Sequence, residues 1–190
     1  MFKAIIAALG LAFSVNAVAA PSIVDVVVQQ TQQSIMAEAH TMGLDWKVGD
    51  SNSYSVDMGF IKGSMVMSVR SIGNDGIWLD QDVDLGFAGK QKIESLLDPN
   101  TGEVKKMLVN GKEQEVPKQD IEVIEITEDK ITVPAGSFDC IHARLKDKKD
   151  NKEINVWMNP QAIPISGMLK TIQPSQFGNV TIVLKSFKKN

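Results

Sequence analysis

The sequence has few of the residues from which catalytic and metal sites are built. It contains one cysteine, Cys140, and two histidines, His40 and His142, in 190 residues. An intramolecular disulfide is therefore excluded, and a zinc site is not expected because such sites draw on clustered His, Cys and carboxylate ligands. The G-x-S-x-G nucleophile motif, the G-x-x-x-x-G-K phosphate loop and the H-E-x-x-H metal motif are also absent. We expect no catalytic residues, no metal and no cofactor, and hence no enzymatic activity.

The chain also lacks an excess of positive charge and a membrane-spanning segment. It has 20 basic and 23 acidic residues, a formal net charge of −3, and no basic block longer than Lys188-Lys189. Such a surface does not favour nucleic acid. Outside the first twenty residues no apolar run reaches 18 residues, the length that a transmembrane helix needs. We expect the mature protein to be soluble, without a membrane anchor.

The first residues have the pattern of a secretory signal peptide. Lys3 precedes an apolar run over residues 4–15, and the small-residue sequence Ala17-Val18-Ala19 follows. Because a proline directly after the scissile bond obstructs signal peptidase, we place the cut after Ala19 and begin the mature chain at Ala20. The junction has no cysteine for a lipid anchor. Residues 1–19 are thus predicted to be a signal peptide, and the protein to be periplasmic or secreted.

Residues 20–190 are enough for a single domain with a sizeable core. Residues 22–41 are predicted to form an amphipathic helix, since Ser22 and Asp25 have capping-box spacing and Val24, Val28 and Ile35 share one stripe. The run Val26-Val27-Val28 favours a strand instead. Gly43 is expected to end the helix.

Nearly all of the remaining chain alternates with a period of two and is interrupted by turn residues, which is typical of an antiparallel meander. Asp98–Gly102 and Asn110-Gly111 are the firmest hairpin turns. Ala88–Leu97 also suits a short helix, and Asn159–Gly178 is expected to be a long irregular lid or rim. The expected strands are 44–48, 52–58, 64–72, 76–86, 91–97, 103–109, 113–116, 120–127, 130–133, 138–146, 152–158 and 178–187.

Two tryptophans fall on nominally polar strand faces. Trp78 alternates with Asp80, Asp82 and Asp84, and Trp157 lies between Asn155 and Asn159. The N-terminal helix could cover them, or they could form an exposed binding patch. The same D-x-D-x-D run fails as an EF-hand loop because its glycine is Gly86, one place late.

Methionines are abundant, and their flexible thioethers suit either core filling or a pocket for irregular apolar ligands. The candidate ligand-binding residues are Met65, Met67, Trp78, Trp157, Met158 and Met168. Cys140 and His142 share a strand face as a nucleophile pair would. However, side chains two apart stand roughly 7 Å from each other, and we expect Cys140 to be a buried structural residue.

Several local phrases resemble those of a known family. They are Val48-Gly49-Asp50 leading to Tyr54, Asp98–Glu103, Val133–Phe138, and Val156–Pro160 leading to Ile163-Pro164. With the signal, the opening helix and the meander, the chain resembles exported β-sheet proteins related to the LolA and LolB lipoprotein carriers of the Gram-negative periplasm, and nearby exported families of unknown function. The resemblance implies a mainly β fold, a strongly curved antiparallel half-barrel with one N-terminal helix, around an apolar cavity that holds acyl chains. No ligand position of those carriers matches a residue here.

Three functions follow from these features. The first is a periplasmic, non-enzymatic binding protein that holds a lipid or another apolar small molecule in the concave face of the sheet. The second is an envelope structural or interaction protein whose outward tryptophans bind a protein partner. The third, an envelope hydrolase assembled from distant loops, has no motif in its favour.

Overall fold

Residues 44–116, 121–149, 151–175 and 178–190 are described by the computed structural model. The predicted signal peptide and the predicted helix at 22–41 lie outside these residues. No helix in the described part is long and apolar enough to span a membrane.

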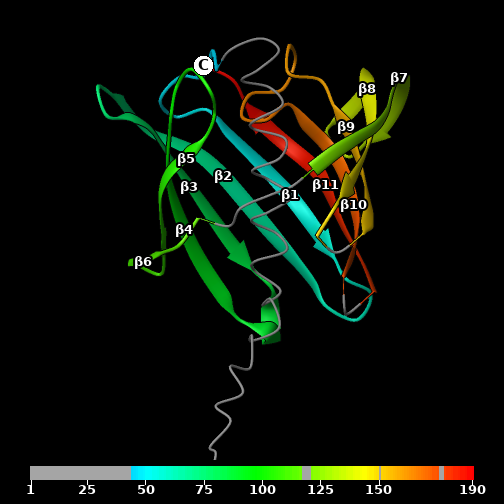
Figure 1. Ribbon diagram of the computed structural model, residues 1–190, viewed down its shortest axis with the longest axis horizontal. Helices are drawn as coiled ribbons and strands as arrows, with labels where there is room; N and C mark the ends of the chain where they lie inside the picture. The colour runs from blue at the N-terminus through cyan, green and yellow to red at the C-terminus, as the bar shows by residue number, and fades with distance from the viewer. Residues whose placement is uncertain (1–43, 117–120, 150, 176–177) are drawn as a thin grey trace, which may run out of the picture.

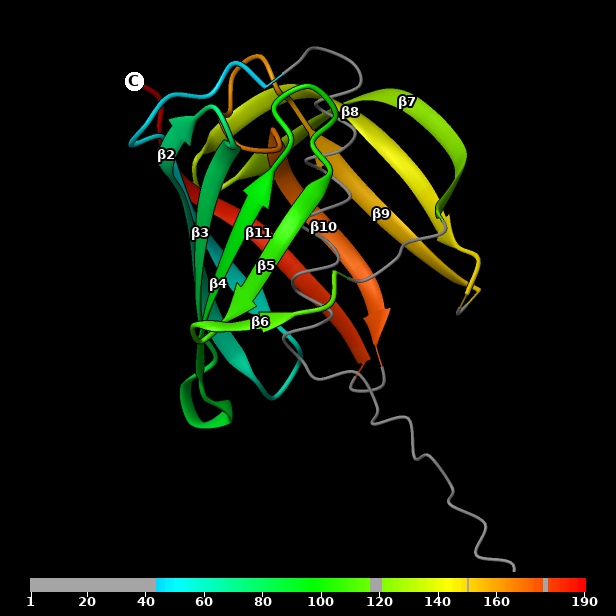
Figure 2. The ribbon, with the colours of Figure 1, turned by 60° about the vertical axis from the view of Figure 1, so that its left-hand side comes forward.

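One antiparallel sheet dominates the described chain, as the period-two alternation predicts. Its strands are β1 (Ser51–Asp57), β2 (Lys62–Gly73), β3 (Gly76–Asp84), β4 (Lys90–Leu97), β5 (Val104–Val109), β6 (Lys112–Gln114), β7 (Ile121–Val133), β8 (Gly136–Asp147), β9 (Lys152–Met158), β10 (Met168–Ser175) and β11 (Gly178–Lys188). A single 3₁₀ turn, Gly86–Ala88, follows β3 in this part of the molecule. The sheet is strongly curved and does not close, which confirms the predicted fold class (Figures 1 and 2).

The strand order is β6-β5-β4-β3-β2-β1-β11-β10-β9-β8-β7. Two meanders, β1–β6 and β7–β11, are therefore joined where β1 pairs with β11, and the chain crosses from one sheet edge to the other between β6 and β7. In Figure 1 the strands β2–β5 and β7–β10 form two walls on either side of β1 and β11. The alternation predicted hairpins but not this crossover, because it carries no information on the pairing of distant strands.

The hairpin turns form as their residues predict. Asn110 and Gly111 have φ angles of 52° and 76°, as a type I′ turn requires. The Asp98 carboxylate accepts hydrogen bonds from the backbone N–H groups of Asn100 and Thr101. Its ion pair with Lys105, together with these hydrogen bonds, lowers the pKa of the Asp98 carboxyl to about 2.

Three expectations for the strands were wrong. Residues 44–48 form no strand, because the chain turns at Lys47, whose N–H donates to the Asp50 carboxylate. Residues 120–127 and 130–133 are not separate strands but parts of the continuous β7. Of the two alternatives for Ala88–Leu97, the strand forms, as β4, and the short helix does not. The supposedly irregular segment 159–178 contains β10, a central strand.

The two faces of the sheet differ sharply. On one face, side chains of β1–β5, β10 and β11 are buried and form one cluster that includes Tyr54, Met65, Leu79, Ile93 and Ile182. Because residues from strands this far apart pack together, this is the concave face, and we call it the inner face. The alternate residues, such as Ser64, Val66 and Asp82, are on the outer face and are half-buried or exposed.

Candidate functional site

The four candidate methionines lie on the inner face. Met65, Met67 and Met168 are fully buried in the main cluster, and Met158 is buried in a smaller cluster with Ile154 and Val156. The β9–β10 register places Met158 directly opposite Met168. All four belong to the concave side of the sheet, where an apolar ligand would lie.

Trp157 lies on the outer face, as its alternation predicts. Its indole stacks on the His142 ring with centroids 4.2 Å apart and planes at 1°, and the Lys170 ammonium lies 5.1 Å from its centroid. The Trp157 Nε1–H donates to Asp129 at 2.9 Å. His142, Trp157 and Lys170 occupy one lateral row, because His142 and Lys170 are the register partners of Trp157. The indole is thus held within a polar cluster.

Trp78 is also outward and is bound in a similar way. The Arg70 guanidinium lies 4.7 Å from its ring centroid, and its Nε1–H donates to Asp75. Four strands separate β3 from β9, so the two indoles stand about 24 Å apart along the sheet at about 4.8 Å per strand. The structure therefore does not bring the six candidate residues together. The methionines face inward, and the tryptophans lie on opposite walls of the outer face.

The hydrogen bond to Asp129 gives a testable consequence. It is the largest of the causes that lower the pKa of the Asp129 carboxyl below its usual range. We expect Trp157→Phe, which keeps an aromatic ring beside His142 but removes the N–H donor, to raise that pKa towards its ordinary value. A carboxyl titration followed by NMR measures the shift. Trp78→Phe is the matched control, and an unchanged Asp129 titration in Trp157→Phe would contradict the assigned contact.

Sequence reasoning missed two inner-face residues, Thr171 and Gln173 of β10. They are 0% and 4% exposed, and neither Thr171 Oγ1 nor Gln173 Oε1 has a hydrogen-bond partner among the described residues. Their register partners are apolar and buried: Val156 and Ile182 flank Thr171, and Val180 lies opposite Gln173. Burial of an unpaired polar group costs free energy. Two such oxygens on one strand are therefore a strong indication of a ligand-binding position.

A tightly held loop leads into β10. Asn52 of β1 donates its amide hydrogens to the backbone carbonyls of Pro164 and Ile165. Ile165, Ser166 and Gly167 have consecutive positive φ angles of 52°, 68° and 61°, a strained conformation that persists only where surrounding contacts hold it. Two further buried oxygens, Asn52 Oδ1 and Ser166 Oγ, have no hydrogen-bond partner in the part of the chain that the structure describes. The end of the inner face near β10 thus concentrates unsatisfied oxygens.

The inner face is almost uncharged. The buried polar and charged residues of the described chain are Asp50, Asn52, Gln81, Ser95, Ser166, Thr171 and Gln173. Of these only Asp50 is ionisable, and its carboxylate accepts hydrogen bonds from the backbone N–H groups of Lys47 and Asn190. Among the buried side chains of the described residues, Asp50 is thus the single ionisable group, and burial of an ionised ligand group beside Thr171 and Gln173 would be costly.

Cys140 is buried, as predicted. Burial is the largest cause that raises the pKa of its thiol, and the Asp129 charge adds to it, so the thiolate form is disfavoured. His142 Nε2 shares a hydrogen bond with Asn155 Oδ1 at 2.9 Å. Neither observation favours a nucleophile pair.

We expect Cys140→Ala to lower the free energy of unfolding by about 1 kcal/mol, since it removes one buried sulfur atom. Chemical denaturation measures this, and the native thiol should react slowly with a thiol reagent. Rapid labelling of the folded protein would contradict the burial.

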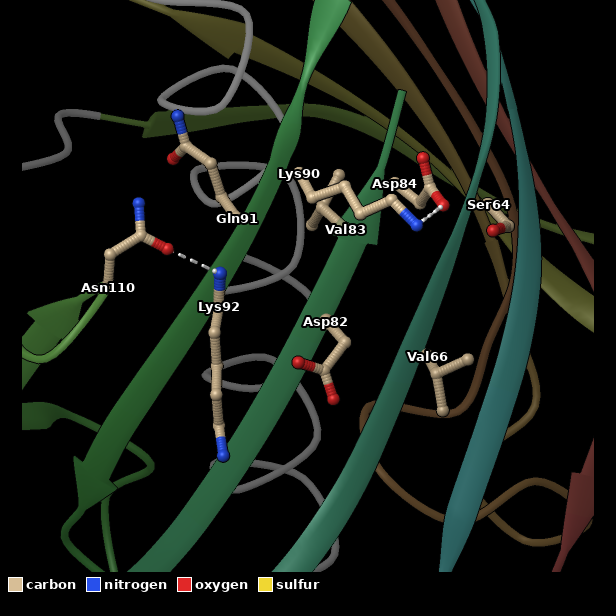
Figure 3. Close-up of a pocket in the computed structure, with 9 residues that line it drawn as sticks. All are labelled: Ser64, Val66, Asp82, Val83, Asp84, Lys90, Gln91, Lys92 and Asn110. Atoms are coloured by element: carbon tan, nitrogen blue, oxygen red, sulfur yellow. Dashed lines mark hydrogen bonds and ion pairs between the residues drawn. The ribbon is translucent and has the colours of Figure 1, made fainter. Parts of the chain in front are cut away.

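The outer face holds a depression of about 430 Å³, drawn in Figure 3. It is lined by Ser64, Val66, Asp82, Val83, Asp84, Lys90, Gln91, Lys92 and Asn110. Lys90 pairs with Asp84 at 2.8 Å, while Lys92 pairs with Asp80, which also pairs with Arg70. Asp80 and Asp84 therefore take part in cross-strand ion pairs, and no group of His, Cys, Asp or Glu in the described ranges is arranged to hold a metal ion.

No protein-family model and no curated protein sequence matches the chain significantly. It is similar to the crystal structure of an exported protein with a YmcC-like fold from Bacteroides fragilis (12% identity, 77% of this chain and 99% of that one, TM-score 0.42). It is also similar to the MucA/MucB complex of Pseudomonas aeruginosa (9% identity, 83% and 55%, TM-score 0.47) and to a hypothetical protein from Chlamydia trachomatis (12% identity, 84% and 92%, TM-score 0.46). None of the three is described as LolA or LolB, so that resemblance stays a prediction.

Proposed function

We propose that the protein is a non-enzymatic binding protein of the cell envelope, periplasmic or secreted, that holds an amphipathic lipid-like molecule against its inner face. The observation that carries this proposal is the pair of buried, unpartnered oxygens of Thr171 and Gln173 between apolar neighbours. The apolar side chains beside these two oxygens suit an acyl chain, and the oxygens themselves need hydrogen-bond donors from the ligand.

The hydrogen-bonding chemistry of Thr171 and Gln173 restricts the chemical class of the ligand. Gln173 Oε1 can only accept a hydrogen bond, and Thr171 Oγ1 can accept or donate one. An amide N–H or a hydroxyl near the end of an acyl chain would satisfy either oxygen, and a ligand with two such donors would satisfy both. Because Asp50 is the single ionisable group among the buried side chains of the described residues, the part of the ligand that reaches Thr171 and Gln173 is uncharged.

The test is a titration of the mature protein with a fluorescent probe that joins a saturated acyl chain to a neutral amide. We expect saturable binding of one probe per chain, and competition by an unlabelled fatty amide more strongly than by an alkane of equal length. Val66→Ser, which alters the outer depression, should leave the affinity unchanged. If Val66→Ser weakens binding of the probe, the site is on the outer face and the proposal fails.

Protein binding through the outward tryptophans is the alternative to a small ligand. In the structure each indole N–H is bonded to an aspartate and each ring contacts a cation. No single surface contains both rings, so we do not advance this alternative from the tryptophans.

A further inference from the structure

The strand β7 is an unusual sheet edge. It ends the strand order and is, with 13 residues, the longest strand of the described sheet. Every residue from Glu122 to Lys130 is exposed. At about 3.3 Å per residue the strand is roughly 43 Å long. Figure 2 shows β7 as the outermost strand at the upper right. Its backbone groups that point away from β8 therefore face outward with no strand of the described chain beside them.

The opposite edge of the sheet has the protection that soluble proteins normally give an edge. There β6 has only three residues, Lys112–Gln114, which are all polar and exposed. In contrast, β7 exposes Val123, Ile124 and Ile126 to 56%, 45% and 62%, and its neighbour β8 exposes Ile141 to 41%. A bulge displaces Ile124, but the β7–β8 register is regular from Glu125 to Val133. A long edge that exposes several apolar side chains and is regular from Glu125 to Val133 is a template for another strand.

Charge along β7 selects the partner. Residues 121–133 contain the acidic residues Glu122, Glu125, Glu128 and Asp129 but a single basic residue, Lys130. Arg144 pairs with Glu125, and Trp157 donates to Asp129. Glu122 and Glu128 form no ion pair with any described residue. If a second copy of the protein paired through the same edge, acidic side chains would lie beside acidic side chains, which is unfavourable.

We propose that β7 docks an extended segment of another protein, in which Lys or Arg alternates with β-branched apolar residues, by strand addition to the sheet. Backbone hydrogen bonds provide the affinity. On the face that β7 shares with Ala143, the apolar residues cover Val123 and Ile126, and on the other face the basic residues meet Glu122, Glu125 and Asp129. The strands β8 and β9 separate this edge from β10, and the inference goes beyond the proposed function, since the edge binds a protein and not a small amphiphile.

Hydrogen exchange on the mature protein, with and without a nine-residue peptide of alternating Lys and Val, tests this inference. We expect peptide binding to slow exchange of amides within residues 121–133 by at least tenfold, while exchange at β6 does not change. The same peptide with Glu in place of Lys should not bind, and a peptide N-methylated on alternate residues should bind at least tenfold more weakly.

Two surface variants separate edge pairing from general attraction. Ile126→Lys, at an exposed position that folding does not require, should weaken the peptide at least tenfold, because it adds a repelling charge to the edge. Glu113→Lys, the same kind of change on β6, should leave binding unaltered. Equal effects of both variants, or slowed exchange away from β7, would overturn the proposal. The proposal would also be overturned if the β7 amides were protected from exchange without peptide and the protein sedimented as a dimer. In that case a second copy of the protein would occupy the edge.

Discussion

Replacing Thr171 by Val and Gln173 by Leu is expected to stabilise the ligand-free protein and to weaken amphiphile binding. Each substitution removes a buried polar group whose oxygen has no hydrogen-bond partner. Relieving two such groups should add about 2 kcal/mol to the free energy of unfolding, which corresponds to a rise in Tm of about 4–8 °C for a domain of this size. The same change removes both hydrogen bonds to the ligand, so affinity for the amide probe should fall about 10- to 100-fold.

Opposite signs for stability and binding distinguish a ligand site from an ordinary core. Thr181→Val is the matched control, because Thr181 lies on the neighbouring strand β11 but is half-buried on the outer face. It should change neither property substantially. If one internal water satisfies both oxygens, the double variant will be no more stable than the wild type and probe affinity will stay the same. That result would contradict the assignment of these residues to a ligand.

Gly167→Ala is expected to be among the most destabilising single methyl additions in the described chain. Gly167 has φ +61°, and an added Cβ would lie 2.6 Å from both Cα and N of Pro160. The left-handed conformation costs an alanine roughly 1 kcal/mol, and relieving the backbone clash adds a penalty of about 2 kcal/mol. We therefore expect chemical denaturation to show a loss of about 3 kcal/mol.

Gly59→Ala separates the cost of the left-handed conformation from the cost of the backbone clash. Gly59 also has a positive φ, +79°, but no atom lies within 4 Å of the added Cβ. It should lose only the conformational part, about 1 kcal/mol. Because Gly167 directly precedes β10, its variant should also weaken the amide probe, whereas Gly59→Ala should not. Equal losses for the two variants would show that the loop yields to the methyl group and that its strained conformation is not tightly held.

Alternation predicted the faces of most strands correctly, including the inward Ile77, Leu79 and Val83 and the outward Trp78. It failed at β10 for a physical reason. The inward residues of this strand include Thr171 and Gln173, whose polarity disguises a buried face, and Pro174 strengthens the impression of a loop. The strand that was missed is thus the one that carries the unsatisfied oxygens. An inward polar pair within an otherwise strand-like segment was the available signal.

The composition of the candidate site was predictable only in part. The burial of Met65, Met67, Met158 and Met168 agrees with either a core or a pocket. Alternation placed Trp78 and Trp157 outward, yet it could not show that β3 and β9 lie on different walls, since that depends on the crossover between β6 and β7. The contact of Trp157 with Asp129, 28 residues away, likewise depends on pairing across β7, β8 and β9.

The most direct test of the account is native mass spectrometry of the protein purified from its own periplasm, without detergent. The account predicts a mature chain that begins at Ala20 and carries one neutral amphiphile with an acyl chain and an amide or hydroxyl group. It also predicts that the same species is reduced about tenfold or more in the Thr171→Val, Gln173→Leu variant. A chain that is ligand-free under conditions that preserve a known lipid complex, or one that carries the same ligand in equal amount in wild type and variant, would contradict it.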